Sequence, residues 1–336
     1  MITHIGKQSV IFKRTPYIKS YASIAGKKES EGPLGNYFDE VEPDEYFGMK
    51  SFEAGESEML KRCIKNAFSK CKLSPSDADV LFSGDLLNQC VSSIYAIRDL
   101  DVPYLGIYGA CSTMAEGLLL SSLSVASGFA EISANATSSH FCCAERQFRF
   151  PLEYGSQRPP TAQWTATASG CIVLSREETK LKITSGTVGK IVDKDIKDAA
   201  NMGSAMAPAF ADTVKTHLND LNLTPDYYDL IISGDLGTLG SDLADELLLR
   251  DGIDIRDRHF DCGCEIYDIK KQDVHSGASG CGCSASVLCA YILPKIEKWE
   301  LKRVLFCATG ALMSPELSKQ GESIPGISHA VAIERA

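Results

Sequence analysis

The sequence predicts an α/β fold built from two duplicated halves. Two observations carry this prediction: an internal repeat, and an alternation of short apolar strands with amphipathic or apolar helices. The segment Leu73–Leu86 recurs as Leu223–Leu236, displaced by 150 residues without a gap, and seven of its fourteen positions are identical. Solenoid repeats have periods of about 20–50 residues, so a repeat this long indicates a duplicated half-domain instead.

The repeat continues beyond this segment. Ala110-Cys111-Ser112 matches Gly282-Cys283-Ser284 at a displacement of 172 residues, and Ala136-Thr137 matches Ala308-Thr309 at the same displacement. The second half should therefore carry an insertion of 22 residues, expected around residues 251–271. We predict one half over residues 1–178 and the other over residues 179–336.

The elements of the first half follow from spacing and composition. Met59, Cys63, Ala67 and Cys71 recur every four residues, as on the apolar face of a helix. Residues 112–127 are apolar almost all round, which is typical of a buried helix. The predicted order is strands at 9–12 and 17–24, a loop rich in glycine, proline and acidic residues at 26–50, a helix at 53–71, a strand at 80–83, a helix at 87–100, a strand at 104–108, a helix at 112–127 and a strand at 132–136. Such alternation favours parallel-type sheets covered by helices.

The bulk composition excludes several classes of function. A net charge of −10 argues against a nucleic-acid surface and against broad attraction to anionic lipid. The start of the chain has no apolar run of the kind found in a secretory signal, and residues 274–294, the longest stretch without charged side chains, are too polar and glycine-rich to span a bilayer. We therefore expect a soluble protein, or one held at a membrane by partners, without a nucleic-acid partner.

The thirteen cysteines are expected to be packed free thiols in a reducing compartment, because the count is odd and most lie in apolar elements. Cys262 with Cys264, and Cys281 with Cys283, could be zinc ligands, although zinc knuckles usually space their cysteines by two residues rather than one. We expect no metal and no cofactor.

Cys111 is the first candidate site residue. It stands where an apolar strand turns through Gly109 into the buried helix. Unpaired N–H groups and the helix dipole at such a position favour a thiolate, either as a nucleophile or as a contact for an anion. The alternative is a packed thiol, because Cys283 occupies the matching place in the second half. Asp85 and Asp235 end matching strands, where a carboxylate either contacts a ligand or caps the next helix.

His140 and Arg146 complete the candidate set. His140 follows a strand end and could act as a base, donate to a carboxylate, or simply be hydrogen-bonded within the fold. Arg146 lies in a stretch, 144–160, in which arginines alternate with aromatic residues. A guanidinium group can bind a carboxylate with two hydrogen bonds, whereas the alternative is surface ion pairs with Glu145 and Glu153.

The residues Gly109-Ala110-Cys111-Ser112 at the start of a buried helix resemble the thiolase and ketoacyl-synthase superfamily. That resemblance implies a five-layer α-β-α-β-α fold with a nucleophilic cysteine at this helix start. A narrower similarity, to the stage V sporulation protein AD family of spore-forming bacteria, is carried by 32–35, 83–89, 109–113, 136–140, 144–149, 202–208 and 308–312.

The narrower resemblance implies a protein that binds dipicolinic acid (pyridine-2,6-dicarboxylate) and supports its uptake into the developing spore. It also implies synthesis in the forespore, peripheral association with the spore inner membrane, and work beside membrane proteins of the same operon. Calcium is a candidate companion of the ligand, and a homodimer is expected from the superfamily.

The sequence departs from condensing enzymes in its second half. The strand end at Ser233–Gly237 has no histidine, and the loop at Ser279–Cys283 has neither asparagine nor histidine. Losing members of a catalytic unit typically costs several orders of magnitude in rate. One hypothesis is therefore a binding protein whose ligand contacts are Asp85, Cys111, His140 and Arg146, with no catalytic residue. The alternative is an acyltransferase that forms an acyl-enzyme at Cys111 from a CoA thioester, with His140 as the base.

Overall fold

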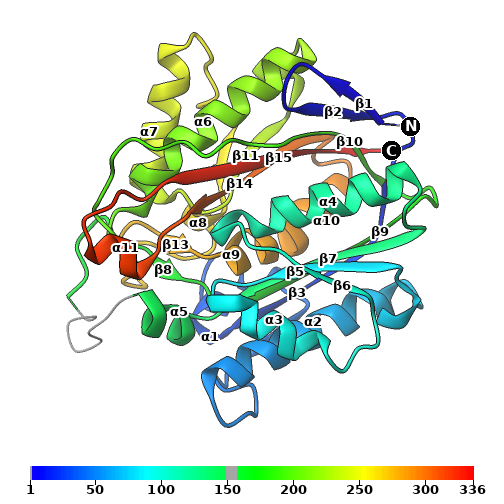
Figure 1. The fold of residues 1–336 in the computed structure, drawn as a ribbon, viewed down its shortest axis with the longest axis horizontal. Helices are drawn as coiled ribbons and strands as arrows, with labels where there is room; N and C mark the ends of the chain where they lie inside the picture. The colour runs from blue at the N-terminus through cyan, green and yellow to red at the C-terminus, as the bar shows by residue number, and fades with distance from the viewer. Residues whose placement is uncertain (1, 149–156) are drawn as a thin grey trace.

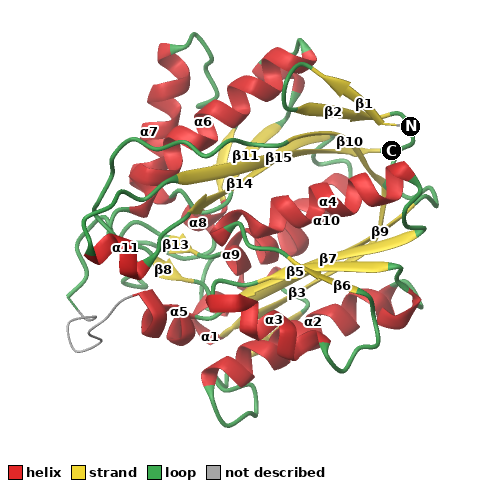
Figure 2. Cartoon of the chain, in the orientation of Figure 1, coloured by secondary structure: helices red, strands yellow, loops and turns green. Residues whose placement is uncertain are grey.

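Five layers of secondary structure make up the molecule in the computed structural model, which describes residues 2–148 and 157–336. Helices α6 (Met202–Leu221) and α7 (Gly237–Arg250) form one outer layer, and α2 (Phe52–Lys70) and α3 (Val91–Ile97) form the other. Two layers of strands lie inside them, and α4 (Thr113–Ser127) with α9 (Cys281–Val287) lies between the strands (Figures 1 and 2). The α-β-α-β-α architecture is confirmed.

The two strand layers have the same internal order. One runs β12-β11-β14-β15-β10 and the other runs β6-β5-β7-β9-β3. In each, the first three strands are parallel and the last two are antiparallel additions. The layers meet at one pairing between Lys182 and Tyr17. The strand bounds are β3 Tyr17–Gly26, β5 Val80–Gly84, β6 Tyr104–Gly106, β7 Ile132–Ser139, β9 Ala168–Ser175, β10 Leu181–Thr187, β11 Leu230–Ser233, β12 His259–Asp261, β14 Arg303–Ala311 and β15 Gly326–Arg335.

Smaller elements decorate this framework. A hairpin of β1 and β2 extends the layer that ends in β10, because β2 pairs with β10. The short strand β4 pairs with β3 in the other layer. Their bounds, with those of the remaining elements, are β1 Ile2–Ile5, β2 Ser9–Phe12, α1 Lys27–Ser30, β4 Glu40–Glu42, α5 Phe141–Phe148, β8 Trp164–Thr165, α8 Cys262–Glu265, β13 Ala278–Ser279, α10 Leu293–Glu297 and α11 Pro315–Lys319, with a π-helix at Leu288–Ile292 and 3-10 helices at Gly35–Tyr37, Pro75–Asp77, Asn88–Cys90, Ala110–Ser112 and Pro225–Tyr227.

Three expectations from the sequence need correction. The helix expected at 87–100 is shorter, because the Asp85 carboxylate accepts hydrogen bonds from Leu87 N and Ser93 N and so folds the intervening residues into a turn. The insertion lies mainly between β12 and α9, at 262–280, and only partly in the longer α7 region. The loop expected at 26–50 also contains α1 and β4.

The core is divided by the two sheets. Central α4 is buried against both of them, with Met114 and Leu118 fully inaccessible. On the outer faces, Met59 of α2 packs on one sheet and Phe210 of α6 packs on the other. Fully burying a side chain of this size contributes roughly 1.5–3 kcal/mol. The two halves of the fold therefore share the central helical layer, which is the most deeply buried part of the molecule.

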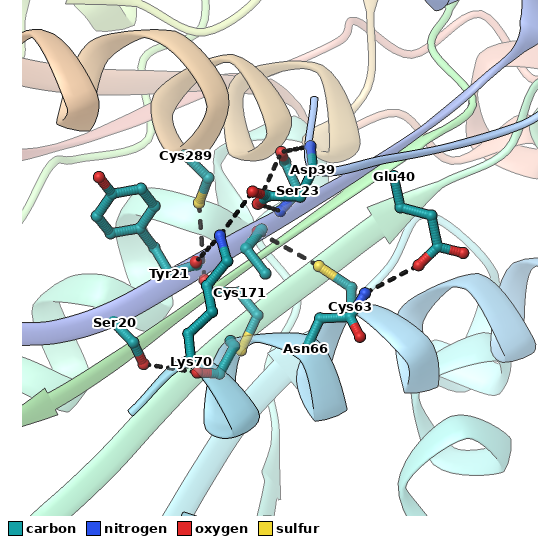
Figure 3. A network of polar contacts seen from close by, with 12 residues as sticks. Ser20, Tyr21, Ser23, Asp39, Glu40, Cys63, Asn66, Lys70, Cys171 and Cys289 are labelled. Carbon is teal, nitrogen blue, oxygen red and sulfur yellow. Dashed lines mark hydrogen bonds and ion pairs between the residues drawn. The ribbon is translucent and has the colours of Figure 1, made fainter. Parts of the chain in front are cut away.

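The thirteen cysteines are free thiols, and most are buried. Figure 3 shows three of them where α2, β3, β9 and the π-helix meet. The Cys63 thiol donates to the carbonyl oxygen of Ala22 at 3.4 Å, and the Cys289 thiol donates to that of Cys171 at 3.7 Å. Burial raises the pKa of Cys63 to about 12. These groups act as small buried side chains with a weak donor.

Candidate functional site

A cavity of about 170 Å³ opens beside Cys111, at the end of the central layer. Several separate parts of the chain form its walls, among them the turn that carries Cys111, the region around α5, the segment that leads into α6, and the end of β14 with the residues after it. Its lining residues are Leu86, Tyr108, Ala110, Cys111, Ala144, Glu145, Phe148, Gln163, Thr165, Ala199, Ala200, Met202, Ser279, Ala311 and Met313. The cavity is the natural candidate for a ligand site, because apolar walls here surround a few polar groups.

Local hydrogen bonds fix the turn that carries Cys111. The Ser112 hydroxyl donates to the carbonyl oxygen of Gly109 at 2.7 Å, and the Thr113 hydroxyl donates to that of Ala110 at 2.6 Å. Ala110 has a φ of 50°, in the left-handed region that non-glycine residues seldom adopt. Gly310 of β14 packs directly on this turn, since an added Cβ there would lie 2.3 Å from the Gly109 carbonyl oxygen. The cysteine is therefore held rigidly at the cavity wall.

The electrostatics of Cys111 reverse the expectation of a thiolate. Burial raises the pKa of this thiol well above its usual range, and the neighbouring charges of Asp235 and Cys281 raise it further. The helix terminus does not overcome these effects. A protonated thiol is a weak nucleophile, because the thiolate is the reactive form.

Asp235 is the buried partner of this thiol. Its carboxylate accepts hydrogen bonds from Gly280 N at 2.8 Å and from the Thr309 hydroxyl at 2.9 Å. Burial raises the pKa of Asp235 to about 7, although hydrogen bonds from Cys111 and Gly280 oppose that rise. Asp235 thus joins the starts of both central helices to the end of β14.

The structure places Asp85 as a helix cap. Its carboxylate accepts from Leu87 N at 2.9 Å and from both the backbone N–H and the hydroxyl of Ser93 at 2.7 Å. Asp85 is fully buried and does not line the cavity. Beside it, burial and then the Asp85 charge raise the pKa of Glu56 to about 8. The two carboxyl groups stabilise the fold beside the site rather than facing into it.

His140 and Arg146 also point away from the cavity lining. His140 Nδ1 accepts from Cys142 N at 3.2 Å, so Nε2 carries the proton and donates to the carbonyl oxygen of Glu45 at 2.8 Å. Burial lowers the pKa of His140, which keeps it neutral. Arg146 forms an ion pair with Glu53 at 2.9 Å on the surface. The next arginine of this stretch, Arg149, lies outside the described residues.

Several lining residues carried no signal in the sequence. Thr165 and Ser279 come from two-residue strands that pair with each other, and strands so short show no periodicity. Tyr108 lies two residues after the end of β6, in the segment that leads to Cys111, so its neighbourhood could have indicated it. The remaining walls are distant in sequence and become neighbours only through the fold.

Within residues 2–148 and 157–336, no group of three or more His, Cys, Asp or Glu side chains is arranged to hold a metal ion. None of the helices in those ranges is long and apolar enough to cross a bilayer.

The layers, the strand orders and the cysteine at the start of α4 define a protein of the thiolase-like class. The crystal structure of Xanthomonas campestris OleA superposes with a TM-score of 0.62 at 12% identity, over 99% of this chain and 100% of that one. Human mitochondrial 3-ketoacyl-CoA thiolase gives 0.60 at 12% identity, over 97% and 100%. The synthase III from Aquifex aeolicus VF5, a 3-oxoacyl-[acyl-carrier-protein] synthase, gives 0.56 at 12% identity, over 95% and 99%. At such identities the likeness shows the fold alone.

Within that class, the chain belongs to the stage V sporulation protein AD family. The profile of this family matches residues 6–334. Stage V sporulation protein AD of Bacillus subtilis (strain 168) is 45% identical over 331 residues, which is 98% of either chain.

Proposed function

We propose that this protein binds dipicolinic acid in the cavity beside Cys111 and supports its uptake into the developing spore. The observation that carries the proposal is the cavity itself, which lies beside the cysteine at the start of α4, where the superfamily resemblance implies a nucleophile. The thiol at its wall is protonated and hydrogen-bonded to a buried carboxyl group. No histidine lines the cavity among the residues that the structure describes.

Two helix ends supply a favourable field for an anion. The 3-10 turn at Ala110–Ser112 leads into α4, and Cys111 lies within it. Ser279 lies two residues before α9, which continues through the π-helix and α10 to Glu297. Helix N-termini present partial positive charge and N–H donors, which suit carboxylates. Dipicolinate is small, flat and doubly charged, so such a cavity could hold it without a basic side chain.

The cellular setting belongs to the same proposal. Synthesis in the forespore, peripheral association with the inner membrane and partnership with membrane proteins of the operon would place the ligand site beside a transport path.

A homodimer is also proposed. The exposed edge of β6, with Leu105 half-exposed, is a surface where a second chain could pair.

Isothermal titration calorimetry with dipicolinate tests the binding. Ala200 lies at the cavity wall and is partly exposed, so Ala200→Phe should fill the space without disturbing the core. We expect saturable binding by the wild type, its loss in Ala200→Phe, and its retention in the small control Ala200→Ser. A parallel titration with calcium present shows whether the ion accompanies the ligand. Absence of heat with folded wild-type protein would overturn the proposal.

Mass spectrometry separates binding from acyl transfer. After incubation with acyl-CoA, the binding proposal expects no adduct on Cys111, because its thiol is protonated. The equivalent cysteine of the second half, Cys283, is fully buried and serves as the internal reference. A stoichiometric adduct on Cys111 followed by turnover would favour an acyltransferase instead.

A further inference from the structure

Two hydroxyl groups lie side by side on the cavity wall. Thr165 of β8 and Ser279 of β13 are register partners in the two-stranded parallel sheet, and both line the cavity. In a paired ladder, the side chains of register partners stand on the same face. Thr165 is 7% exposed and Ser279 is 2% exposed, so both residues are held mostly within the protein and reach the outside only through the cavity.

The backbone holds these residues firmly. Trp164 N donates to the carbonyl oxygen of Gly277 at 2.9 Å, and Ala166 N donates to that of Ser279 at 2.8 Å. The methyl group of Thr165 faces Gly280, where an added Cβ would lie 3.2 Å from it. Because the methyl side is packed against the chain, the hydroxyl has little freedom to turn elsewhere.

Neither hydroxyl forms a hydrogen bond within residues 2–148 and 157–336, and neither is among the sealed polar atoms there that lack a partner, because both residues border the cavity. The neighbouring Ser139 shows the contrast, since its hydroxyl donates to the carbonyl oxygen of Ala166 at 2.7 Å and accepts from Gly282 N at 3.1 Å. Both hydroxyls are therefore available to a molecule in the cavity, which is water when the site is empty and a ligand that accepts hydrogen bonds when it is filled.

The charges of the lining residues limit which groups in the cavity can receive a carboxylate. Among the described lining residues, Glu145 is the one charged side chain, and no lysine, arginine or histidine is present. A carboxylate that enters must therefore be received by neutral donors. Paired hydroxyl groups fit this task, because a carboxylate has two oxygens that each accept more than one hydrogen bond.

We propose that the Thr165 and Ser279 hydroxyls form a carboxylate subsite, which receives one carboxylate of a rigid aromatic dicarboxylate while the rest of the ligand lies toward Cys111. This inference rests on the proposed function and adds to it the residues that distinguish a dicarboxylate from a monocarboxylate. The role is binding and orientation, with no chemical step.

Calorimetry with two ligands tests the subsite. Pyridine-2,6-dicarboxylate and pyridine-2-carboxylate are titrated into the wild type, Thr165→Val and Ser279→Ala. A hydrogen bond to a charged group corresponds to roughly a tenfold or greater change in affinity. We expect each variant to weaken the dicarboxylate about tenfold, to weaken the monocarboxylate less, and so to reduce the preference for the dicarboxylate.

Two controls protect the result from folding effects. Thr165→Ser restores the hydroxyl and should return the affinity to that of the wild type. Ser133→Ala removes another buried hydroxyl without a partner, far from the cavity lining, and should leave both affinities unchanged. If the wild type binds the dicarboxylate and both Thr165→Val and Ser279→Ala keep the wild-type preference for it, the subsite alone is overturned. A wild type that binds neither ligand would overturn the proposed function and the subsite together.

Discussion

Replacing Asp235 by asparagine should change how the stability of the protein depends on pH. Asp235 is fully buried, and burial raises its pKa from 3.8 to about 7. Between those two values the unfolded carboxyl group is ionised while the folded one still holds its proton. The folded state then binds more protons, so the free energy of unfolding of the wild type falls as the pH rises.

The magnitude follows from the size of that shift. One pKa unit corresponds to about 1.4 kcal/mol, and the shift spans about three units, so the Asp235 charge costs on the order of 4 kcal/mol above pH 7. Asparagine keeps an acceptor for Gly280 N but does not titrate. The stability of Asp235→Asn relative to the wild type should therefore rise by about this amount between pH 4 and pH 8, and stay level above that.

Guanidinium unfolding followed by circular dichroism at a series of pH values measures the difference directly. Asp77→Asn is the matched control, because that carboxyl group is exposed and hydrogen bonds from Ser74 lower its pKa, so its difference curve should be flat from pH 4 to pH 8. A difference curve for Asp235→Asn that is equally flat would refute the reasoning. The same result would show that a charged Asp235 is tolerated beside Cys111.

Three further predictions concern the cysteine, the turn that holds it and the central helix. Cys111 should react with iodoacetamide at pH 8 at least about tenfold more slowly than in the unfolded chain, as followed by mass spectrometry, and fast labelling would contradict its raised pKa. Gly310→Ala should cost about 1–3 kcal/mol in chemical unfolding because its Cβ would meet backbone, whereas Gly106→Ala, whose Cβ would meet only the end of a tyrosine side chain, should cost less. Leu118→Ala should cost about 2–5 kcal/mol, whereas the half-exposed Leu317→Ala should stay within about 0.5 kcal/mol, and equal losses would contradict the buried position of α4.

The fold was predictable because its signals repeat. The match between Leu73–Leu86 and Leu223–Leu236 marks the same strand and turn in the two sheets, and the apolar stretch after Cys111 is indeed the buried central helix. These features depend on periodicity and composition, which a sequence records directly. The shortened α3 could not be predicted in the same way, since it depends on where one carboxylate, Asp85, finds its donors.

The site was less accessible to prediction. Cys111 was found from its place at a strand-to-helix turn, but its pKa is raised first by burial and then by Asp235, and both depend on parts of the chain that are distant in sequence. Asp85 and His140 stand at strand ends and resemble ligand residues by position, yet their polar atoms bond to the surrounding backbone. Thr165 and Ser279 matter because two very short strands bring them together.

The shared central layer also has a consequence for the origin of the chain. Each sheet is covered on one side by its own outer helices, and on the other by helices that also touch the opposite sheet. An ancestral polypeptide of half this length would have exposed an apolar sheet face to water unless a second copy covered it. A half-length chain with this fold would therefore need a second copy to cover that face, and the present chain supplies both halves within one molecule.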